Sequence, residues 1–223
     1  MFIGAFSPRS SGKSTVMTWL LHALAEAGYP VKGFDADESE QFYRWWDASE
    51  VIGEDGKPTG THTYPFEVEQ LASSRFHQDA PGRLPAGTIG GVDCGHLENH
   101  ASIGWSVLRV VDLAIVVCAA TNGDLERLEE LPMDSFIAQV APKREDKKIP
   151  ETWVLLCRVQ AGTTKMPKGL RNQLVASGWK VFTTEIPSVQ KYAETAEGVV
   201  IRAKGSEFAN LVAEMERRGL ISK

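Results

Sequence analysis

An uninterrupted apolar run at residues 113–120, LAIVVCAA, is the feature that most restricts the fold of this chain. A strand on the surface of a sheet alternates polar and apolar residues, so a run without a polar face indicates a strand that is buried on both faces. Such strands occur in parallel sheets that are covered by helices on both sides. The run is too short to span a bilayer, and we therefore expect no association with a membrane.

Similar segments alternate with helical patterns along the rest of the chain. A helix is expected over 13–28, where apolar residues recur at helical spacing, and another over 206–219. The expected strands are 1–6, 30–37, 60–71, 87–95, 110–120, 152–159 and 180–187. This alternation predicts an α/β fold with a doubly wound, mostly parallel sheet and helices on both faces. We expect a single domain over residues 1–223, without an additional N-terminal DNA-binding domain.

Composition restricts the class of protein further. The chain has 223 residues, 43% of them hydrophobic, which is enough for a buried core, and its formal net charge is −5. This charge argues against a strongly basic nucleic-acid-binding protein, although a local basic patch remains open. The three cysteines show no C-x-x-C spacing, which argues against a disulfide framework or a zinc site and favours a reducing cytoplasm.

The stretch FSPRSSGKST, residues 6–15, lies between the first expected strand and the first expected helix. Its end fits the phosphate-binding pattern of Gly, four residues and Gly-Lys-Ser/Thr, but Ser7 stands where the first glycine belongs. Small residues such as Ser10, Ser11 and Gly12 let backbone N–H groups approach a phosphate at the positive end of the helix. The alternative is a serine-rich turn that caps an ordinary helix.

Three side chains at the end of this loop would act on a bound nucleotide. Lys13 would neutralise the β- and γ-phosphates, and the Ser14 hydroxyl would ligate Mg²⁺. The Thr15 hydroxyl could reach the α-phosphate.

Further polar residues follow the expected strands at the edge where sites occur in such sheets. Asp35 and Asp37 end the second strand, Asp93 ends the glycine-rich strand, and Arg158 ends the strand at 152–159. Acids placed this close together repel each other unless a cation or a water network uses them. The alternative is that Asp37 and Asp93 cap helices, which is a common role for aspartate.

Several motifs in this order resemble those of the ParA/MinD family of deviant-Walker ATPases, in particular the small ParA-type plasmid and chromosome partition proteins. The segments SSGKST, GFDADESEQFYRWW and GGVDCG are similar to the loop, the Asp-x-Asp strand and the Asp-Cys-Gly strand end of that family. VLRVVDLAIVVCAATNGDLERLEEL, LLCRVQAGT and EIPSVQKYAETAEG resemble its later segments, so the resemblance covers most of the chain.

This resemblance implies ATP and ADP as ligands with Mg²⁺, an ATP-dependent homodimer and slow, partner-stimulated hydrolysis. It also implies binding to non-specific DNA, a centromere-binding ParB-like partner and a cytoplasmic, nucleoid-associated location. By residue, it implies that Asp37 orients or activates the attacking water, and that Asp35 and Asp93 support the metal's water shell. Arg158 and Pro187 fall where the family contacts the base.

The chain departs from the family at the start of the loop. The family's first loop lysine, which reaches the partner's nucleotide across the dimer, corresponds to Pro8. We expect Arg9 to supply that charge instead, because a guanidinium suits phosphate contact. The alternative is an exposed arginine at the tip of a loop.

Lys191, Arg202 and Lys204 are the candidate contacts to DNA, and ordinary surface charge is the alternative for all three. The preferred function is that of a ParA-like ATPase for DNA partition. The alternatives are a nucleotide-dependent switch or scaffold with negligible hydrolysis, and a metabolic ATP-dependent enzyme of the same fold.

Overall fold

The computed structural model describes most of the chain, and all structural statements below concern that part. The described residues are 1–7, 12–95, 97, 101–121, 123, 126, 128, 133–160, 165–197 and 201–223. Across them, no helix has the length and apolar character needed to cross a membrane.

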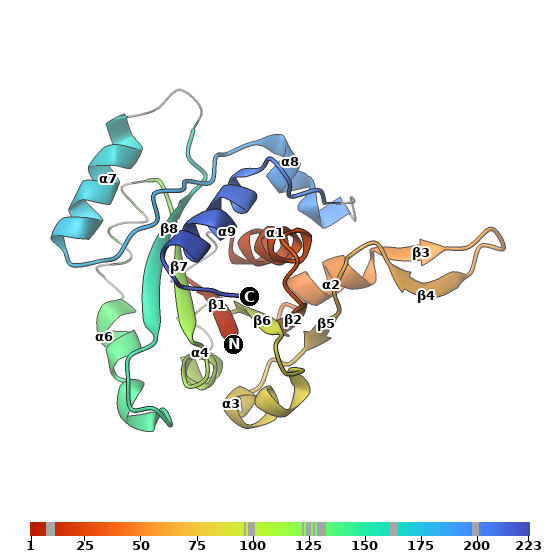
Figure 1. Cartoon of the computed structure of the whole chain (residues 1–223), viewed down its shortest axis with the longest axis horizontal. Coiled ribbons are helices and arrows are strands. Elements are labelled where there is room, and N and C mark those ends of the chain that lie inside the picture. The colour runs from red at the N-terminus through yellow and green to blue at the C-terminus, as the bar shows by residue number, and fades with distance from the viewer. Residues whose placement is uncertain are drawn as a thin grey trace.

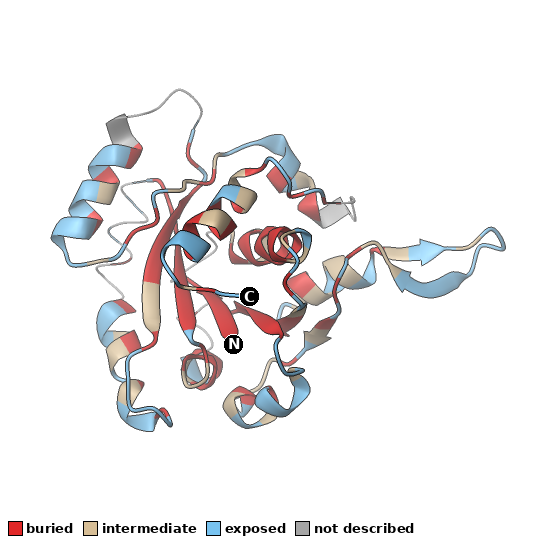
Figure 2. Ribbon diagram, in the orientation of Figure 1, coloured by how far each residue is buried: buried red, intermediate tan, exposed pale blue. Residues whose placement is uncertain are grey.

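The predicted α/β architecture with a parallel sheet is confirmed. The described residues form a six-stranded parallel sheet with the strand order β5-β2-β6-β1-β7-β8 (Figure 1). Its strands are β1 (Phe2–Phe6), β2 (Val31–Ala36), β5 (Val68–Gln70), β6 (Ile89–Cys94), β7 (Leu113–Ala119) and β8 (Glu151–Cys157). All residues of β1, β6 and β7 are buried, as the apolar run at 113–120 predicts (Figure 2).

Helices cover both faces of this sheet. One face packs on α1 (Lys13–Glu26) and α9 (Glu207–Arg217), which share a core with Ile3, Ile115 and Leu155. On α9 the apolar residues Phe208, Leu211, Val212 and Met215 are buried, together with Glu214. The other face contacts α3 (Phe76–Asp79), α4 (Ala101–Leu108), α6 (Met133–Ala138) and α7 (Lys165–Ala176).

Glycine in β6 lets α1 approach the sheet closely. A Cβ atom at Gly91 would lie 2.6 Å from the Met17 sulfur and 2.7 Å from a Leu21 methyl carbon of α1. Such distances are shorter than van der Waals contact, so α1 would have to move away from any larger residue. The glycine-rich strand therefore fixes how deeply the helix after the phosphate-loop motif sits on the sheet.

The expected strand over 60–71 is wrong as a single element. Its first part belongs to β4 (Pro58–His62), which pairs with β3 (Glu50–Ile52) in an antiparallel hairpin, and only its last part forms β5. The hairpin projects from the body of the molecule and is largely exposed (Figures 1 and 2). It follows α2 (Gln41–Asp47), where Trp46 stacks on His62 at 3.9 Å between ring centroids.

The expected strand over 180–187 is also wrong, because the segment pairs with β8 only at isolated positions. It forms the bridges Val154↔Val181 and Val159↔Pro187. Between these bridges the backbone of Thr183 and Thr184 donates to a side chain of α9 instead of to β8. The segment therefore follows the edge of the sheet without forming a regular strand.

Candidate functional site

The candidate residues converge where two neighbouring strands send their helices to opposite faces of the sheet. β1 and β6 are paired, yet α1 follows β1 onto one face and α4 follows β6 onto the other. In open α/β sheets this arrangement leaves a crevice at the carboxyl ends of the strands, where ligands bind.

The start of α1 faces this crevice. Gly12 precedes the helix with φ 94°, a left-handed conformation that favours glycine. Lys13, the first helical residue, is buried with 5% of its surface exposed. The Ser14 hydroxyl lies 3.4 Å from the side-chain oxygen of Gln41, at the start of α2. The helix therefore presents its positive end, a buried ammonium group and a hydroxyl to one place.

Two carboxylates lie side by side next to this helix end. Asp35 and Asp93 are paired residues of the parallel strands β2 and β6, and both are fully buried. Asp35 is held in place, because its two oxygens accept from the backbone amides of Asp37 and Tyr43, each at 2.9 Å. Both oxygens of Asp93 are buried without a hydrogen-bond partner among the described residues.

The surroundings of this pair disfavour two negative charges. Burial and then the Asp35 carboxylate raise the pKa of Asp93, and the Lys13 ammonium group only partly offsets them. The Ser14 hydroxyl is close enough to lower the same pKa, but its hydrogen bond runs to Gln41. Burial also raises the pKa of Asp35, against the hydrogen bonds from Tyr43 and Asp37. A cation bound here would relieve the repulsion between the two carboxylates.

Asp37 lies at the rim of the same group. One of its oxygens accepts from the Ser39 amide at 3.0 Å, and its carboxyl carbon lies against Gly95, 3.2 Å from where a Cβ atom would be. It is partly exposed, unlike Asp35 and Asp93. Its carboxylate therefore has access to solvent beside two buried acids.

A cavity of about 280 Å³ adjoins the start of α1 and contains the predicted base contacts. Arg158 directly follows β8 with φ 53°, and two of its guanidinium nitrogens lie 3.9 Å from where a Gly12 Cβ atom would be. Pro187 lies on the same cavity, which is lined by Gly12, Thr15, Val16, Cys157, Arg158, Ile186, Pro187, Ser188, Val189, Tyr192, Ala193 and Phe208. The structure thus brings Gly12, Thr15, Arg158 and Pro187 around one space.

Other predicted residues are placed differently or not described. Pro8, Arg9, Ser10 and Ser11 lie outside the described residues, so the first half of the loop motif has no structural account. Sequence reasoning did not assign Gln41 its contact with Ser14 or place Tyr192 and Phe208 on the cavity wall. The Gln after the Asp-x-Asp strand was a visible signal for the first, whereas the aromatic residues had no local signal.

The candidate DNA contacts lie on the exposed surface. Lys191 is 3.6 Å from the Glu207 carboxylate and lies over the Tyr192 ring at 4.7 Å. The side chains of Arg202 and Lys204 are exposed, and the Lys204 amide donates to the Glu26 carboxylate at 2.6 Å. Acidic groups therefore accompany two of the three basic residues.

Comparisons with known proteins agree with this architecture. No protein-family model matches the chain, and no curated protein matches its sequence. Solved structures do match: McdA of Cyanothece, in an ATP complex, has a TM-score of 0.67 and 12% identity over 100% of this chain and 97% of that one. A ParA family ATPase from Chlorobium tepidum has a TM-score of 0.64 and 16% identity over 96% of each chain.

A third match has a different kind of name. Cobyrinic acid a,c-diamide synthase from Mycobacterium smegmatis, with bound ADP and magnesium, has a TM-score of 0.61 and 13% identity over 98% of this chain and 96% of that one. The chain thus has the α/β fold of P-loop NTPases. Within that class, its fold is that of the ParA/MinD-type ATPases, as the sequence motifs predict.

Proposed function

We propose that this chain is a ParA-like ATPase for DNA partition, which binds ATP or ADP with Mg²⁺ at the crevice described above. One observation carries the proposal. The start of α1, with Lys13 and Ser14, meets the carboxylates Asp35 and Asp93 on one side and the cavity with Arg158 on the other. Phosphates would lie at the helix end and the base in the cavity. McdA, in its ATP complex, shares the fold.

The residues at the crevice fit a magnesium–nucleotide complex. Mg²⁺ usually keeps several waters and takes one or two carboxylates together with substrate phosphates. Asp93 has two buried oxygens without a partner among the described residues, so a bound cation or its water would satisfy them. Ser14 would hold the ion directly and Asp35 would support its water shell, while Mg²⁺ would neutralise charge on the phosphates. Asp37, at the exposed rim, would orient the attacking water.

Binding can be tested by titrating the protein with Mg²⁺–ATP and Mg²⁺–ADP. Lys13→Ala removes the buried ammonium group and should abolish binding, while circular dichroism and urea unfolding show that the fold is intact. Lys57→Ala is the matched control, because Lys57 is exposed on the hairpin that projects from the body of the molecule (Figure 1). Nucleotide affinity that is unchanged in Lys13→Ala would refute the assignment of the site.

DNA binding is the second part of the proposal, and the exposed basic side chains of Lys191, Arg202 and Lys204 support it. ATP should promote binding to non-specific DNA and ADP should not. Each phosphate contact that is removed by substitution should lower the slope of log affinity against log salt concentration by about one. Absence of DNA binding at low salt in every nucleotide state would count against a role in partition. The ATP-dependent homodimer and the ParB-like partner belong to the same proposal.

Two other functions use the same fold. A switch with negligible hydrolysis is favoured by Pro8, which replaces the lysine that acts across the dimer. A metabolic enzyme is suggested by the match to cobyrinic acid a,c-diamide synthase, but it needs a pocket for a second substrate beside the nucleotide.

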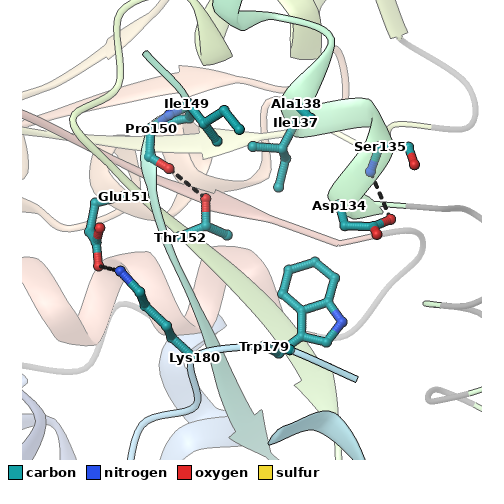
Figure 3. Close-up of a pocket in the computed structure, with 11 residues that line it drawn as sticks. Asp134, Ser135, Ile137, Ala138, Ile149, Pro150, Glu151, Thr152, Trp179 and Lys180 are labelled. Atoms are coloured by element: carbon teal, nitrogen blue, oxygen red, sulfur yellow. Dashed lines mark hydrogen bonds and ion pairs between the residues drawn. The ribbon is translucent and has the colours of Figure 1, made fainter. Parts of the chain in front are cut away.

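A second cavity among the described residues does not meet that need. It has about 480 Å³ and lies at the start of β8, between Ile137, Thr152 and Trp179 (Figure 3). The candidate site lies at the opposite, carboxyl ends of the strands, so this cavity supports no transfer between the two. ATP turnover measured with and without DNA separates the ATPase from the switch.

A further inference from the structure

The segment that carries Pro187 to the cavity passes through an irregular stretch next to β8. Regular pairing begins with Val154, whose amide donates to the Lys180 carbonyl and whose carbonyl accepts from the Phe182 amide. In a regular parallel ladder the Thr184 amide would be the next donor to Leu156, but the Ile186 amide takes that place at 2.9 Å. The segment therefore contains two residues more than β8 over this interval.

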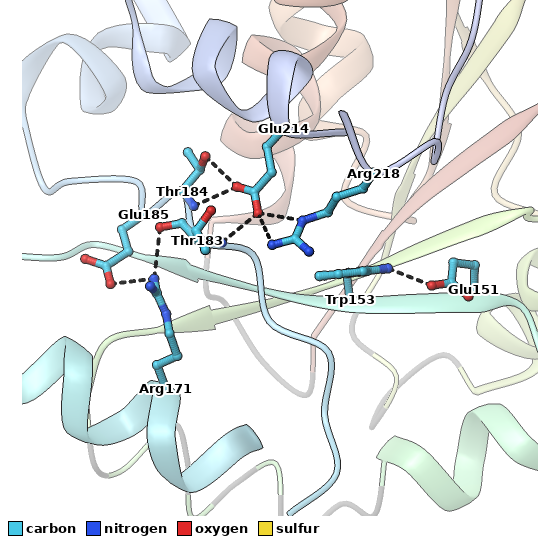
Figure 4. Close-up of polar contacts among 8 residues, drawn as sticks. All are labelled: Glu151, Trp153, Arg171, Thr183, Thr184, Glu185, Glu214 and Arg218. Atoms are coloured by element: carbon cyan, nitrogen blue, oxygen red, sulfur yellow. Dashed lines mark hydrogen bonds and ion pairs between the residues drawn. The ribbon is translucent and has the colours of Figure 1, made fainter. Parts of the chain in front are cut away.

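In the irregular stretch, backbone amides that do not donate to β8 donate instead to a buried carboxylate of α9. The oxygens of Glu214 accept from the amides of Thr183 and Thr184, both at 2.8 Å, and from the Thr184 hydroxyl at 2.7 Å (Figure 4). Glu214 is 1% exposed and is paired with Arg218 at 2.8 Å. Burial alone would raise the pKa of Glu214, but the hydrogen bonds from Thr183 and Thr184 outweigh burial and lower it to about 2.

The other side of the same stretch is held by α7. Arg171 donates to the Thr183 carbonyl at 3.0 Å and forms an ion pair with Glu185 at 2.6 Å (Figure 4). After this stretch the chain returns to the sheet, where the Ser188 amide donates to the Val159 carbonyl at 2.8 Å. Residues 186–189 then line the 280 Å³ cavity, and Phe208 of α9 is also part of its lining.

We propose that Glu214 is a positioning residue for the base side of the nucleotide site. Its carboxylate holds Thr183 and Thr184 out of the β8 ladder, and so it sets the register in which Ile186, Pro187 and Ser188 line the cavity. This inference rests on the proposed function. It adds that α9, far along the chain from the phosphate-loop motif, determines how well the base is held while the phosphate side is left unaffected. Without the carboxylate, the ladder can continue and shift the wall by up to two residues.

Two ligands distinguish binding at the base side of the site from binding at the phosphate side. Mg²⁺–ATP uses both, whereas inorganic tripolyphosphate with Mg²⁺ uses only the phosphate side, and calorimetric titration measures each. Glu214→Gln keeps the size of the side chain but places an amide N–H against donor groups. It should weaken ATP binding by about tenfold or more, as expected for the loss of charge-assisted hydrogen bonds, and leave tripolyphosphate binding unchanged.

Matched variants keep the test decisive. Glu216→Gln makes the same chemical change on α9, where the carboxylate contacts Tyr29 instead of the 183–184 stretch, and should change neither affinity. Thr184→Val removes only the hydroxyl bond and should weaken ATP binding less than Glu214→Gln does, which gives a mild variant if the latter folds poorly. Hydrogen exchange at the Thr183 and Thr184 amides reports the register without any ligand.

The outcomes are distinct. The positioning role would be overturned if Glu214→Gln weakened the binding of ATP and of tripolyphosphate equally. It would also be overturned if neither affinity changed. Unaltered exchange at the amides of residues 183–188 would overturn it as well. If the wild type binds neither ligand, the proposed function fails, and the exchange measurement still decides whether Glu214 sets the register.

Discussion

The imidazole of His22 should make the protein sensitive to mild acid. His22 lies on α1 with 2% of its surface exposed, edge-on to the rings of Tyr64 and Phe66 at 4.7 and 5.0 Å. Its Nε2 atom has no hydrogen-bond partner among the described residues. Burial therefore lowers the pKa of His22 from 6.5 to about 4. Burial also raises the pKa of Tyr64 to about 12, so the phenol stays neutral.

The sign and size of the effect follow from these two values. Between pH 6.5 and 4 the unfolded chain binds a proton that the native protein does not, so the free energy of unfolding falls as the pH falls. Each pKa unit corresponds to about 1.4 kcal/mol, and the shift from 6.5 to about 4 gives roughly 3 kcal/mol in total. Most of this, about 2.5 kcal/mol, is lost by about pH 4.5. Single domains are stable by only about 5–15 kcal/mol, so the loss is measurable.

This loss of unfolding free energy can be measured by urea unfolding of the wild type and of His22→Phe at pH 7.5 and pH 4.5. Phenylalanine keeps a ring between Tyr64 and Phe66 but cannot be protonated. Other groups, such as Asp35 with its raised pKa, act with the opposite sign but are common to both proteins. The wild type should lose about 2.5 kcal/mol more than the variant over this interval. Equal losses in the two proteins would show that His22 is already accessible to protons in the native state.

Three further predictions concern the site and its support. Asp37→Ala should leave ATP binding near normal but suppress single-turnover hydrolysis, because the carboxylate acts on the water; lost binding with normal turnover per bound ATP would contradict this. Arg9→Ala should keep nucleotide binding but lose the dimer that sedimentation detects with a non-hydrolysable ATP analogue, and equal dimerisation of both proteins would exclude the role of Arg9. Gly91→Ala should lower the free energy of unfolding by about 1–3 kcal/mol, because the added methyl group overlaps Met17 and Leu21 of α1. An unchanged urea midpoint would mean that α1 adjusts freely.

The sequence predicted those parts of the fold that depend on local patterns. The apolar run at 113–120 identified β7, because a strand buried on both faces needs no polar residue. The carboxyl ends of β2 and β6 could also be predicted, because the charged residues Asp35 and Asp93 interrupt apolar, buried segments. Asp35 and Asp93 lie side by side because β2 and β6 are adjacent in the parallel sheet.

Long-range contacts account for what was missed. Residues 180–187 have the composition of a strand, but Glu214, 30 residues beyond Thr184, takes the hydrogen bonds of the backbone. No signal in the segment itself reveals that competitor. The hairpin of β3 and β4 was missed for another reason, because its short strands are largely exposed and do not alternate polar and apolar residues.

The projecting hairpin has a practical consequence for fluorescence experiments. All three cysteines are buried, which shields them from reagents that react with thiolates. Burial also raises the pKa of the Cys94 and Cys157 thiols, so these two form thiolates less readily. Glu54 is exposed in the turn of the hairpin, and exposed loop tips tolerate change. A cysteine introduced by Glu54→Cys would therefore take up a maleimide dye selectively. Such a dye would stand clear of the crevice, on an element joined through α2 to the residue that contacts Ser14.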